Sequence, residues 1–475
     1  MKTKYILVVI AVALMTVSCS DFLNKQPIDQ FSDGNFWTSE SNVSAFAFGL
    51  YNQFDGYGNG NTTRGFYFQQ FNDDMVSESF SDFNKNAPAT STLWDWSAIR
   101  KANILLERVP TVPMADAAKA HWIGVARFFR AYEYFNKVKN YGDVPWINKS
   151  LDVTDVQILY KARDSRTLVM DSVLADLNYA CANMYASQND DRVNKNVALA
   201  LKSRACLYEG TFRKYHGIAD YTKFLEASKD ASSKLFAEKY TISTPYQAIY
   251  NSLDLSKNTE MIFYKAYALG IMTHGMSGFL TSSTTIAGLN KGAIESYVCK
   301  DGLPISQSPL YKGDTKMFNV LANRDGRLIQ TIDTSLCFVN HAYRGTTSTT
   351  GYKDFKFVNE TLVPAERNAP SNTTDAPLFW LSEVYVNYAE ACAELGTITQ
   401  GDLDMSLNKL RTRAGVAPLK VNGGAPYSGT NGDVAIVDPK RDGDVDPLIW
   451  EIRRERRVEL MMDGFRYDDL MRWKK

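Results

Sequence analysis

This sequence has little cysteine, little histidine and no excess of charge of either sign. In 475 residues there are six cysteines, four histidines, 53 basic side chains and 53 acidic side chains. Binding to nucleic acid needs a basic excess that neutralises phosphates, so we expect no nucleic-acid partner. The five cysteines that follow Cys19 have no close spacing, and the pattern therefore predicts neither a disulfide framework nor a zinc site.

The short motifs of common enzyme classes are also lacking. The chain has no Gly-x-Ser-x-Gly, no His-Glu-x-x-His and no Gly-rich phosphate loop. Its histidines are isolated from one another and from the cysteines. A glycosidase needs two carboxylates about 5 to 9 Å apart, and the sequence gives no reason to expect such a pair. We therefore expect a protein that is not an enzyme and that holds no cofactor.

One acidic segment, "DPKRDGDVD", resembles a calcium loop in part. Asp442, Asp444 and Asp446 follow one another at the right steps. Pro447 replaces the turn glycine of such a loop, and Arg453 stands where a bidentate glutamate belongs. The pattern favours a solvated loop over a metal site.

No apolar run is long enough to cross a membrane. The longest one, Tyr5 to Val17, follows two lysines and is about a dozen residues long, whereas a spanning helix needs roughly 20. This layout is typical of a secretory signal. Cleavage before Cys19 would leave an N-terminal thiol for acyl chains, so we predict a lipoprotein signal peptide over residues 1–18 and a lipid anchor at Cys19. An ordinary signal peptide with an incidental cysteine is the alternative.

Four segments between residues 117 and 236 have apolar residues at helical spacing. In "AAKAHWIGVARFFRAYEYFNKVKNYGDVP" the stripe includes Tyr132, and Gly142 stops the helix. The next segment, "DSRTLVMDSVLADLNYA", has Ser165 as a cap at its start. The others are "NVALALKSRACLYEGTFRKY" and "YTKFLEASKDASSKLF". Their starts lie roughly 25 to 40 residues apart, which favours helical hairpins of the tetratricopeptide type.

After residue 236 the helical spacing of apolar residues stops, and it returns near the C-terminus. Residues 240 to 375 hold loops and short β-prone runs such as "MIFYKAY" and "KDFKFV". Helical spacing returns in "LFWLSEVYVNYAEACAELG" and "LDMSLNKLRTRAG". The last stretch, "LIWEIRRERRVELMMDGFRYDDLMRW", predicts one helix, with pairs such as Glu451 and Arg454 forming ordinary electrostatic contacts on its surface.

Several separated segments together resemble the SusD/RagB family of outer-membrane nutrient-binding lipoproteins of the Bacteroidetes. They occur in the family's order, and only residues 240 to 375 lack a match. The chain differs at Trp380, where many relatives have arginine, and at "RWKK", beyond which relatives continue with a tail that we expect to be missing here. The segments are "CSDFLNKQP", "FWTSESNVSAFAFGLYNQF", "LWDWSAIRKANILLERV", "ARFFRAYEYFNKVKNYGDVP", "EVYVNYAEACAELG", "LNKLRTRAG" and "RRERRVELMMDGFRYDDLMRW".

The resemblance implies a mostly α fold, an α/α superhelix of tetratricopeptide-like hairpins with a loop-rich ligand-binding face that is partly irregular and partly short strands. We expect one domain over residues 19–475. Its parts would be a helical part to about residue 240, a variable part to about 375 and C-terminal helices from about 376. The resemblance also implies a lipid-anchored protein on the cell surface that passes ligand to a SusC-like, TonB-dependent transporter.

Glycan-binding residues are expected in an aromatic, polar stretch between residues 55 and 96. Sugars offer flat apolar faces and a rim of hydroxyls, which suit aromatic rings and polar side chains. Of Trp94 and Trp96, two residues apart, only one is expected to serve as a platform. The resemblance places Asp73 and Trp96 nearest to the ligand contacts of the family's starch-binding member. The candidates are Trp96, Trp94, Asp73, Asp74, Asn72 and Tyr57.

Each of these candidates also has a structural interpretation. The tryptophans could pack in the core, and the polar residues could form turns or caps. The central region adds a second aromatic and polar set, Tyr297, His341, Tyr343 and Arg344.

The function expected from these observations is the capture of a soluble oligosaccharide or polysaccharide, without chemistry, for delivery to the transporter. The alternatives are a peptide-capturing homologue, a surface glycosidase and a scaffold that binds only other proteins.

Overall fold

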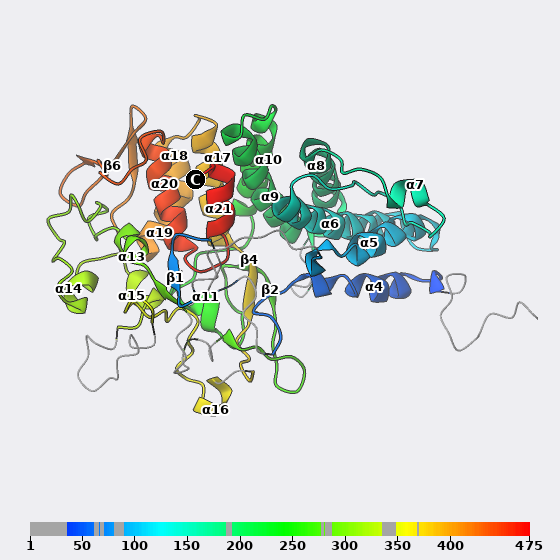
Figure 1. Cartoon of the computed structure of the whole chain (residues 1–475), viewed down its shortest axis with the longest axis horizontal. Coiled ribbons are helices and arrows are strands. Elements are labelled where there is room, and N and C mark those ends of the chain that lie inside the picture. The colour runs from blue at the N-terminus through cyan, green and yellow to red at the C-terminus, as the bar shows by residue number, and fades with distance from the viewer. Residues whose placement is uncertain are drawn as a thin grey trace, which may run out of the picture.

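The computed structural model describes residues 36–60, 66, 71–79, 90–186, 192–276, 280, 287–334, 348–367 and 370–475. The predicted signal peptide, Cys19, and the candidates His341, Tyr343 and Arg344 lie outside these residues. The described part is mostly helical, which confirms the predicted fold class (Figure 1). Among its helices, none is both long and apolar enough to cross a membrane.

The helices predicted in the N-terminal half are confirmed. Ser165 accepts a hydrogen bond from the backbone N–H of Leu168 and so caps α8 as expected. Gly142, with φ +71°, follows the last residue of α6. The helices of this half are α4 (Glu40–Phe48), α5 (Ser97–Arg108), α6 (Asp116–Tyr141), α7 (Val156–Leu159), α8 (Arg166–Asn183), α9 (Lys195–Tyr215) and α10 (Tyr221–Phe236), with short 3-10 turns η1 (Tyr51–Gln53), η3 (Thr92–Trp94) and η4 (Val109–Thr111).

The C-terminal helices differ from the prediction in two places. The predicted last helix is in fact two helices, because Met462 and Gly464 adopt positive φ values of 66° and 86° between them. The predicted helix that begins at Leu378 starts three residues later, since residues 376–380 are a strand. The helices are α17 (Leu381–Glu394), α18 (Gln400–Met405), α19 (Leu407–Arg413), α20 (Pro447–Glu459) and α21 (Arg466–Trp473).

The central region holds short strands and short helices. The β-prone run at 261–267 is confirmed as β2 (Met261–Lys265), which pairs antiparallel with β4 (Ala376–Trp380). The run at 353–358 forms no strand and makes only an isolated bridge at Asp354. The short elements are β1 (Met75–Ser77), β3 (Ala287–Leu289), β5 (Lys420–Asn422), β6 (Ala425–Ser428), β7 (Val434–Ala435), α11 (Ala248–Asn251), α13 (Lys291–Ser296), α14 (Met317–Leu321), α15 (Leu328–Thr331) and α16 (Pro364–Arg367).

The long helices pack in chain order. Helix α5 lies on α6, α6 on α8, α8 on α9, α9 on α10, and α10 on α17, which also contacts α20. Helix α21 returns to α9. In Figure 1 the helices α4 to α8 lie towards one end of the longest axis and β6 and α14 towards the other, with α17 to α21 between them and β2 and β4 below.

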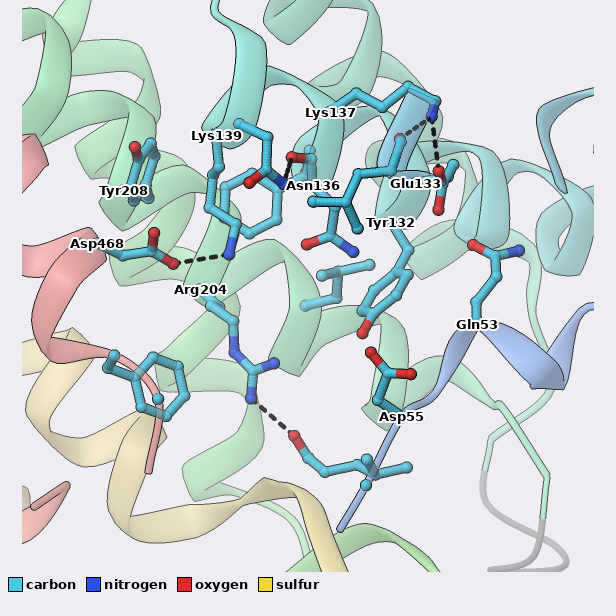
Figure 2. Close-up of a pocket in the computed structure, with 18 of the residues that line it drawn as sticks. Gln53, Asp55, Tyr132, Glu133, Asn136, Lys137, Lys139, Arg204, Tyr208 and Asp468 are labelled. Carbon is cyan, nitrogen blue, oxygen red and sulfur yellow. Dashed lines mark hydrogen bonds and ion pairs between the residues drawn. The ribbon is translucent and has the colours of Figure 1, made fainter. Parts of the chain in front are cut away.

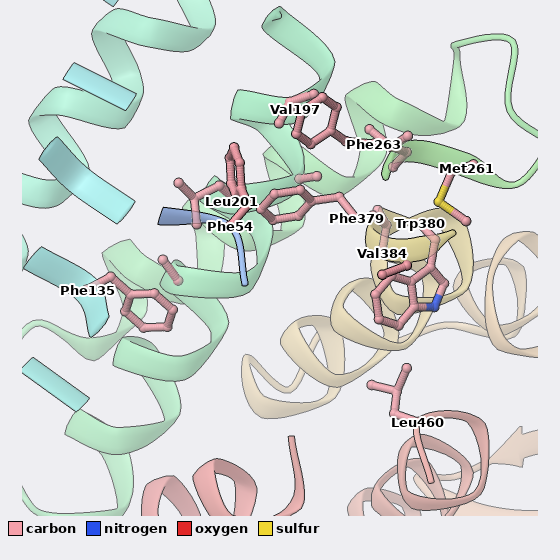
Figure 3. Close-up of a cluster of buried hydrophobic side chains, with 14 of the residues drawn as sticks. Phe54, Phe135, Val197, Leu201, Met261, Phe263, Phe379, Trp380, Val384 and Leu460 are labelled. Atoms are coloured by element: carbon pink, nitrogen blue, oxygen red, sulfur yellow. The ribbon is translucent and has the colours of Figure 1, made fainter. Parts of the chain in front are cut away.

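One apolar core joins these parts. The ring centroids of Phe54, after α4, and Phe263, in β2, are 5.3 Å apart. Leu201 of α9 and Phe379 of β4 are buried in the same cluster, shown in Figure 3. Residues far apart in the sequence are therefore held together by burial of apolar surface.

Ion pairs buried beneath α20 and α21 correct a second expectation. Glu451 of α20, expected on the helix surface, is 2% exposed, and Glu455 and Glu459 of the same helix are 3% and 0% exposed. Glu459 contacts Arg327 of the central region at 2.7 Å and Arg413 of α19 at 2.5 Å. Arg472 of α21 contacts Glu390 of α17 at 2.5 Å. These pairs connect three segments that are distant in sequence.

We expect Glu459→Gln to lower the free energy of unfolding by about 1.5 to 3 kcal/mol, because Arg327 and Arg413 would each lose one charged hydrogen-bond partner in a site closed to water. Arg327 would keep Asp325 and Glu455, and Arg413 would keep Glu260. Urea unfolding followed by circular dichroism measures the change. The control is Asp444→Asn, whose carboxylate is exposed and contacts Lys475 at 2.7 Å, and it should leave the midpoint unchanged. Equal midpoints for the two variants would contradict this role for Glu459.

The same site predicts an acid-sensitive stability. Burial alone would raise the pKa of Glu459, but the charges of Arg413 and Arg327 outweigh it and lower the pKa to about 2. In the unfolded chain a glutamate has a pKa of about 4.3. The ionised carboxylate therefore stabilises the fold above about pH 4.3, and this contribution is lost as the pH falls towards 2. The stability difference between the wild type and Glu459→Gln should shrink from pH 7 to pH 3, and a constant difference would refute the assignment.

Candidate functional site

A cleft of about 780 Å³ lies where α5, α6 and α9 meet the turn before α21. Helix α6 supplies much of one wall, and β4 and residues 463–469 supply the opposite side. Figure 2 shows the polar side chains that point into it. Those that the following paragraphs use are Gln53, Tyr132, Asn136, Lys139, Arg204 and Asp468.

Helical spacing brings several side chains of α6 to this wall. Tyr132, Asn136 and Lys139 stand four and three residues apart, so they share one face of the helix. Lys139 Nζ contacts the carboxylate of Asp468 on α21 at 2.7 Å, which joins the two sides of the cleft (Figure 2). The pKa of Tyr132 is raised, chiefly by burial, so its hydroxyl stays protonated and can donate a hydrogen bond.

Arg204 of α9 lines the cleft, and its partners hold its guanidinium in place. Its Nε and Nη2 atoms each donate to the carboxylate of Glu383 at 2.6 Å, and Nη2 also donates to the carbonyl of Leu378 at 2.7 Å. The guanidinium lies 4.2 Å from the centre of the Phe379 ring. Such bidentate pairing and ring contact hold an arginine in one orientation.

The side-chain amide of Gln53 is unusual in this cleft. Its oxygen and nitrogen are buried and make no hydrogen bond with any described residue. A buried amide without a partner costs roughly 1 to 3 kcal/mol. The amide lies beside the cleft, as Figure 2 shows, and offers one acceptor and two donors.

Trp94 and Trp96 are not among the residues that line the cleft, although they alternate in sequence with residues that do. Leu93, Asp95 and Ser97, their neighbours in sequence, line the cleft. The two indole rings meet edge to face with centroids 5.2 Å apart. Both are half-buried against the main core.

Each tryptophan ring also has a cation over it. Lys137 Nζ lies 4.9 Å from the centre of the Trp96 ring. The Arg163 guanidinium lies 5.1 Å from the centre of the Trp94 ring. The structure thus brings the two predicted tryptophans together in one cluster of two indole rings and two cations.

The acidic candidates are held in ion pairs with the C-terminal helices. Asp73 accepts hydrogen bonds from Arg466 Nε at 2.5 Å and Nη2 at 2.7 Å. Burial would raise the pKa of Asp73, but these hydrogen bonds and the charge of Arg457 outweigh it and hold the pKa below its usual value. Asp74, buried, pairs with Arg457 at 2.6 Å. Asn72 caps the turn, accepting from the N–H groups of Asp74 at 2.8 Å and Met75 at 3.0 Å.

Tyr57 and Tyr297 do not fit the role of an open platform. Both side chains are 0% exposed. The Tyr57 hydroxyl donates to the carbonyl of Tyr250 at 2.7 Å, and that of Tyr297 contacts the Thr331 hydroxyl at 3.1 Å. Burial raises the pKa of both hydroxyls. Their rings pack in the core, with no face towards solvent.

The residues that sequence reasoning missed are Gln53, Asn136 and Arg204. None belongs to an aromatic loop, and Tyr132 was assigned to the apolar stripe of its helix. A signal was present in the polar Glu133 and Asn136 beside that stripe, but periodicity alone does not separate a cleft from a core.

The acidic run considered as a calcium loop has other partners. Lys475 Nζ lies 3.1 Å from the carboxylate of Asp442 and 2.7 Å from that of Asp444. Asp446 caps α20 by accepting from the N–H of Leu448. In the part of the chain that the structure describes, no three His, Cys, Asp or Glu side chains gather as metal ligands would.

Two family models match the chain. The model described as the SusD family matches residues 281–475, and one described as starch-binding associating with outer membrane matches residues 21–207.

Curated relatives align over most of the chain. The SusD-like protein P38 of Formosa agariphila is 24% identical, over 96% of this chain and 88% of the relative. The starch-binding protein SusD of Bacteroides thetaiotaomicron is 24% identical, over 87% of this chain and 85% of the relative.

Solved structures share the fold. A SusD-like carbohydrate-binding protein from Bacteroides fragilis superposes with a TM-score of 0.72 at 23% identity, covering 92% of this chain and 87% of its own. A laminarin-binding SusD-like protein gives a TM-score of 0.64 at 18% identity, covering 92% of each chain. With the ordered motifs at both ends of the sequence, these matches lead to one conclusion: the chain belongs to the SusD/RagB family.

Proposed function

We propose that this protein is a non-catalytic, cell-surface lipoprotein of the outer membrane that captures oligosaccharides or polysaccharide. It would deliver them to a SusC-like, TonB-dependent transporter. The observation that carries the proposal is the cleft beside Trp94 and Trp96, whose walls offer hydroxyl, amide and guanidinium groups. Relatives named as starch-binding and laminarin-binding support a glycan as the ligand.

The chemistry of the cleft suits a sugar in three ways. The Tyr132 hydroxyl and the amides of Gln53 and Asn136 can exchange hydrogen bonds with sugar hydroxyls. Trp94 and Trp96 are half-buried and neighbour residues that line the cleft, and the exposed parts of their rings can meet the apolar face of a sugar ring. The charges of Lys139 and Arg204 are already neutralised by Asp468 and Glu383, so a neutral ligand leaves no unpaired charge in them.

Of the other residues expected to bind glycan, Asp73, Asp74 and Asn72 support the site indirectly. They hold the loop that carries them against α20 and α21. The proposal therefore assigns direct contact to the cleft residues and to Trp94 and Trp96.

Affinity electrophoresis of residues 20–475 through gels that contain plant, fungal and host polysaccharides tests glycan capture. We expect one polysaccharide to retard the protein and Gln53→Leu to weaken that binding roughly tenfold, because a good buried hydrogen bond is worth about 1.4 kcal/mol. Urea unfolding should find Gln53→Leu as stable as the wild type or more so, since it removes a buried amide that lacks a protein partner. The double variant Trp94→Ala/Trp96→Ala should abolish retardation.

The control is Gln400→Ala, a change of the same residue type on α18, outside the cleft. It should leave retardation unchanged. Retardation by no polysaccharide would refute glycan capture and favour a peptide ligand. Release of reducing ends during the assay would favour a glycosidase, and wild-type retardation by both cleft variants would place the ligand elsewhere.

Cys19→Ala tests the anchor. Without the thiol no diacylglycerol can be attached, and the protein should move from the membrane pellet to the soluble fraction. Immunoblots of fractionated cells measure the distribution, and Cys299→Ala, a change of a buried cysteine, serves as the control. A Cys19→Ala protein that still sediments with membranes would remove the anchor from the proposal.

A further inference from the structure

The segment between α6 and α8, residues 149–164, has large apolar side chains on its outside. Val153 is 85% exposed, Val156 55%, Leu159 47% and Tyr160 84%. These four fall within eight consecutive residues, around the single-turn helix α7. Elsewhere in the described residues, exposed large apolar side chains stand singly or in pairs along the chain. We call these four residues the α7 patch.

Polar contacts, not apolar packing, hold the α7 patch in its shape. The Asp155 carboxylate contacts Lys149 Nζ at 2.8 Å and accepts from the N–H of Asp152 at 2.8 Å. Lys161 Nζ contacts the Asp164 carboxylate at 2.5 Å. The arrangement is the reverse of an ordinary surface loop, because charged groups pair within the segment and aliphatic and aromatic groups face water.

A cluster of exposed apolar side chains indicates that a partner with an apolar surface binds to it. Exposed apolar side chains are common singly, but a contiguous group marks a site of interaction with protein or membrane. Residues 149–164 hold three basic and three acidic side chains, so the segment carries no net charge that would select a strongly charged protein surface.

The position of the α7 patch favours a lipid surface. Helix α7 and the start of α4 lie at the same end of the longest axis of the molecule (Figure 1). The Cα atoms of Cys19 and Phe36 are 17 residue steps apart along the chain and can be separated by at most about 60 Å. Acyl chains at Cys19 would therefore tether this end to the bilayer. Tyrosine with aliphatic neighbours suits the boundary between headgroups and acyl chains.

We propose that Val153, Val156, Leu159 and Tyr160 rest in the headgroup region of the membrane to which Cys19 is anchored. This inference depends on the lipid anchor of the proposed function. The contact fixes the orientation of the protein on the membrane, with the N-terminal helices near the lipid and the C-terminal helices away from it.

The test places an environment-sensitive nitrobenzoxadiazole label at Val153→Cys in the full, lipidated chain, reconstituted in phosphatidylethanolamine–phosphatidylglycerol vesicles. The matched control is Ile271→Cys, which is 86% exposed in the central region. Wild-type protein treated with the label gives the background from its own cysteines. We expect spin-labelled lipid to quench the label at 153 about twofold or more above the label at 271.

Sedimentation of the same samples reports the anchor independently. Protein that sediments with the vesicles but shows equal quenching at both positions would overturn the contact while leaving the anchor in place. Protein that fails to sediment would overturn both. If the label at 153 is shielded from an aqueous quencher only in native membranes, and never reached by lipid-borne quencher, the patch binds a protein and the lipid proposal is wrong.

Discussion

The burial of Glu459 between two arginines is the constraint on which the C-terminal half depends. Its carboxylate belongs to α20, Arg413 to α19 and Arg327 to the central region, so one acidic group fixes three segments together. A charge removed from water is tolerated only where its partners surround it. The central region, which also buries apolar side chains such as Ile294, Leu328 and Phe357 in the core, thus gains a fixed place against the helices. The turn between α20 and α21, which forms one side of the cleft, is held by another buried pair, in which Lys356 Nζ contacts the Asp463 carboxylate at 2.7 Å.

The helices could be predicted from the sequence because their signals are local. The apolar stripe of α6, the Ser165 cap and the stop at Gly142 act within one or two turns. The break at Met462 and Gly464 was missed although Asp463-Gly464 is a turn signal, because the helical spacing of the apolar residues around it favoured one helix. The burial of Glu459 was missed for a related reason: its partner Arg327 lies more than a hundred residues away, and no local pattern reports such a contact.

The sequence pointed to aromatic candidates and gave little signal for the polar residues of the cleft. Trp94 and Trp96 stood out by composition, and their neighbours Leu93 and Asp95 line the cleft, whereas the two indole rings do not. Tyr57 and Tyr297 carried the same kind of signal, yet both rings are buried. Arg204 lies within an apolar helix and gave no signal of its own. Composition identifies residue types that can bind a sugar, but only the packing of distant elements decides which of them face an open space.

The pairing of β2 with β4 sets an order of events in the folding of this chain. The two strands lie roughly a hundred residues apart, whereas α6, α8, α9 and α10 contact their neighbours in sequence. Local contacts close small loops and form early, while distant pairs form late because a long loop must first be closed. The wall of the cleft on α6 and α9 thus takes shape before β4 and α21 complete the opposite side. Since the chain is synthesised from its N-terminus, one side of the candidate site is complete only after the last residues have been made.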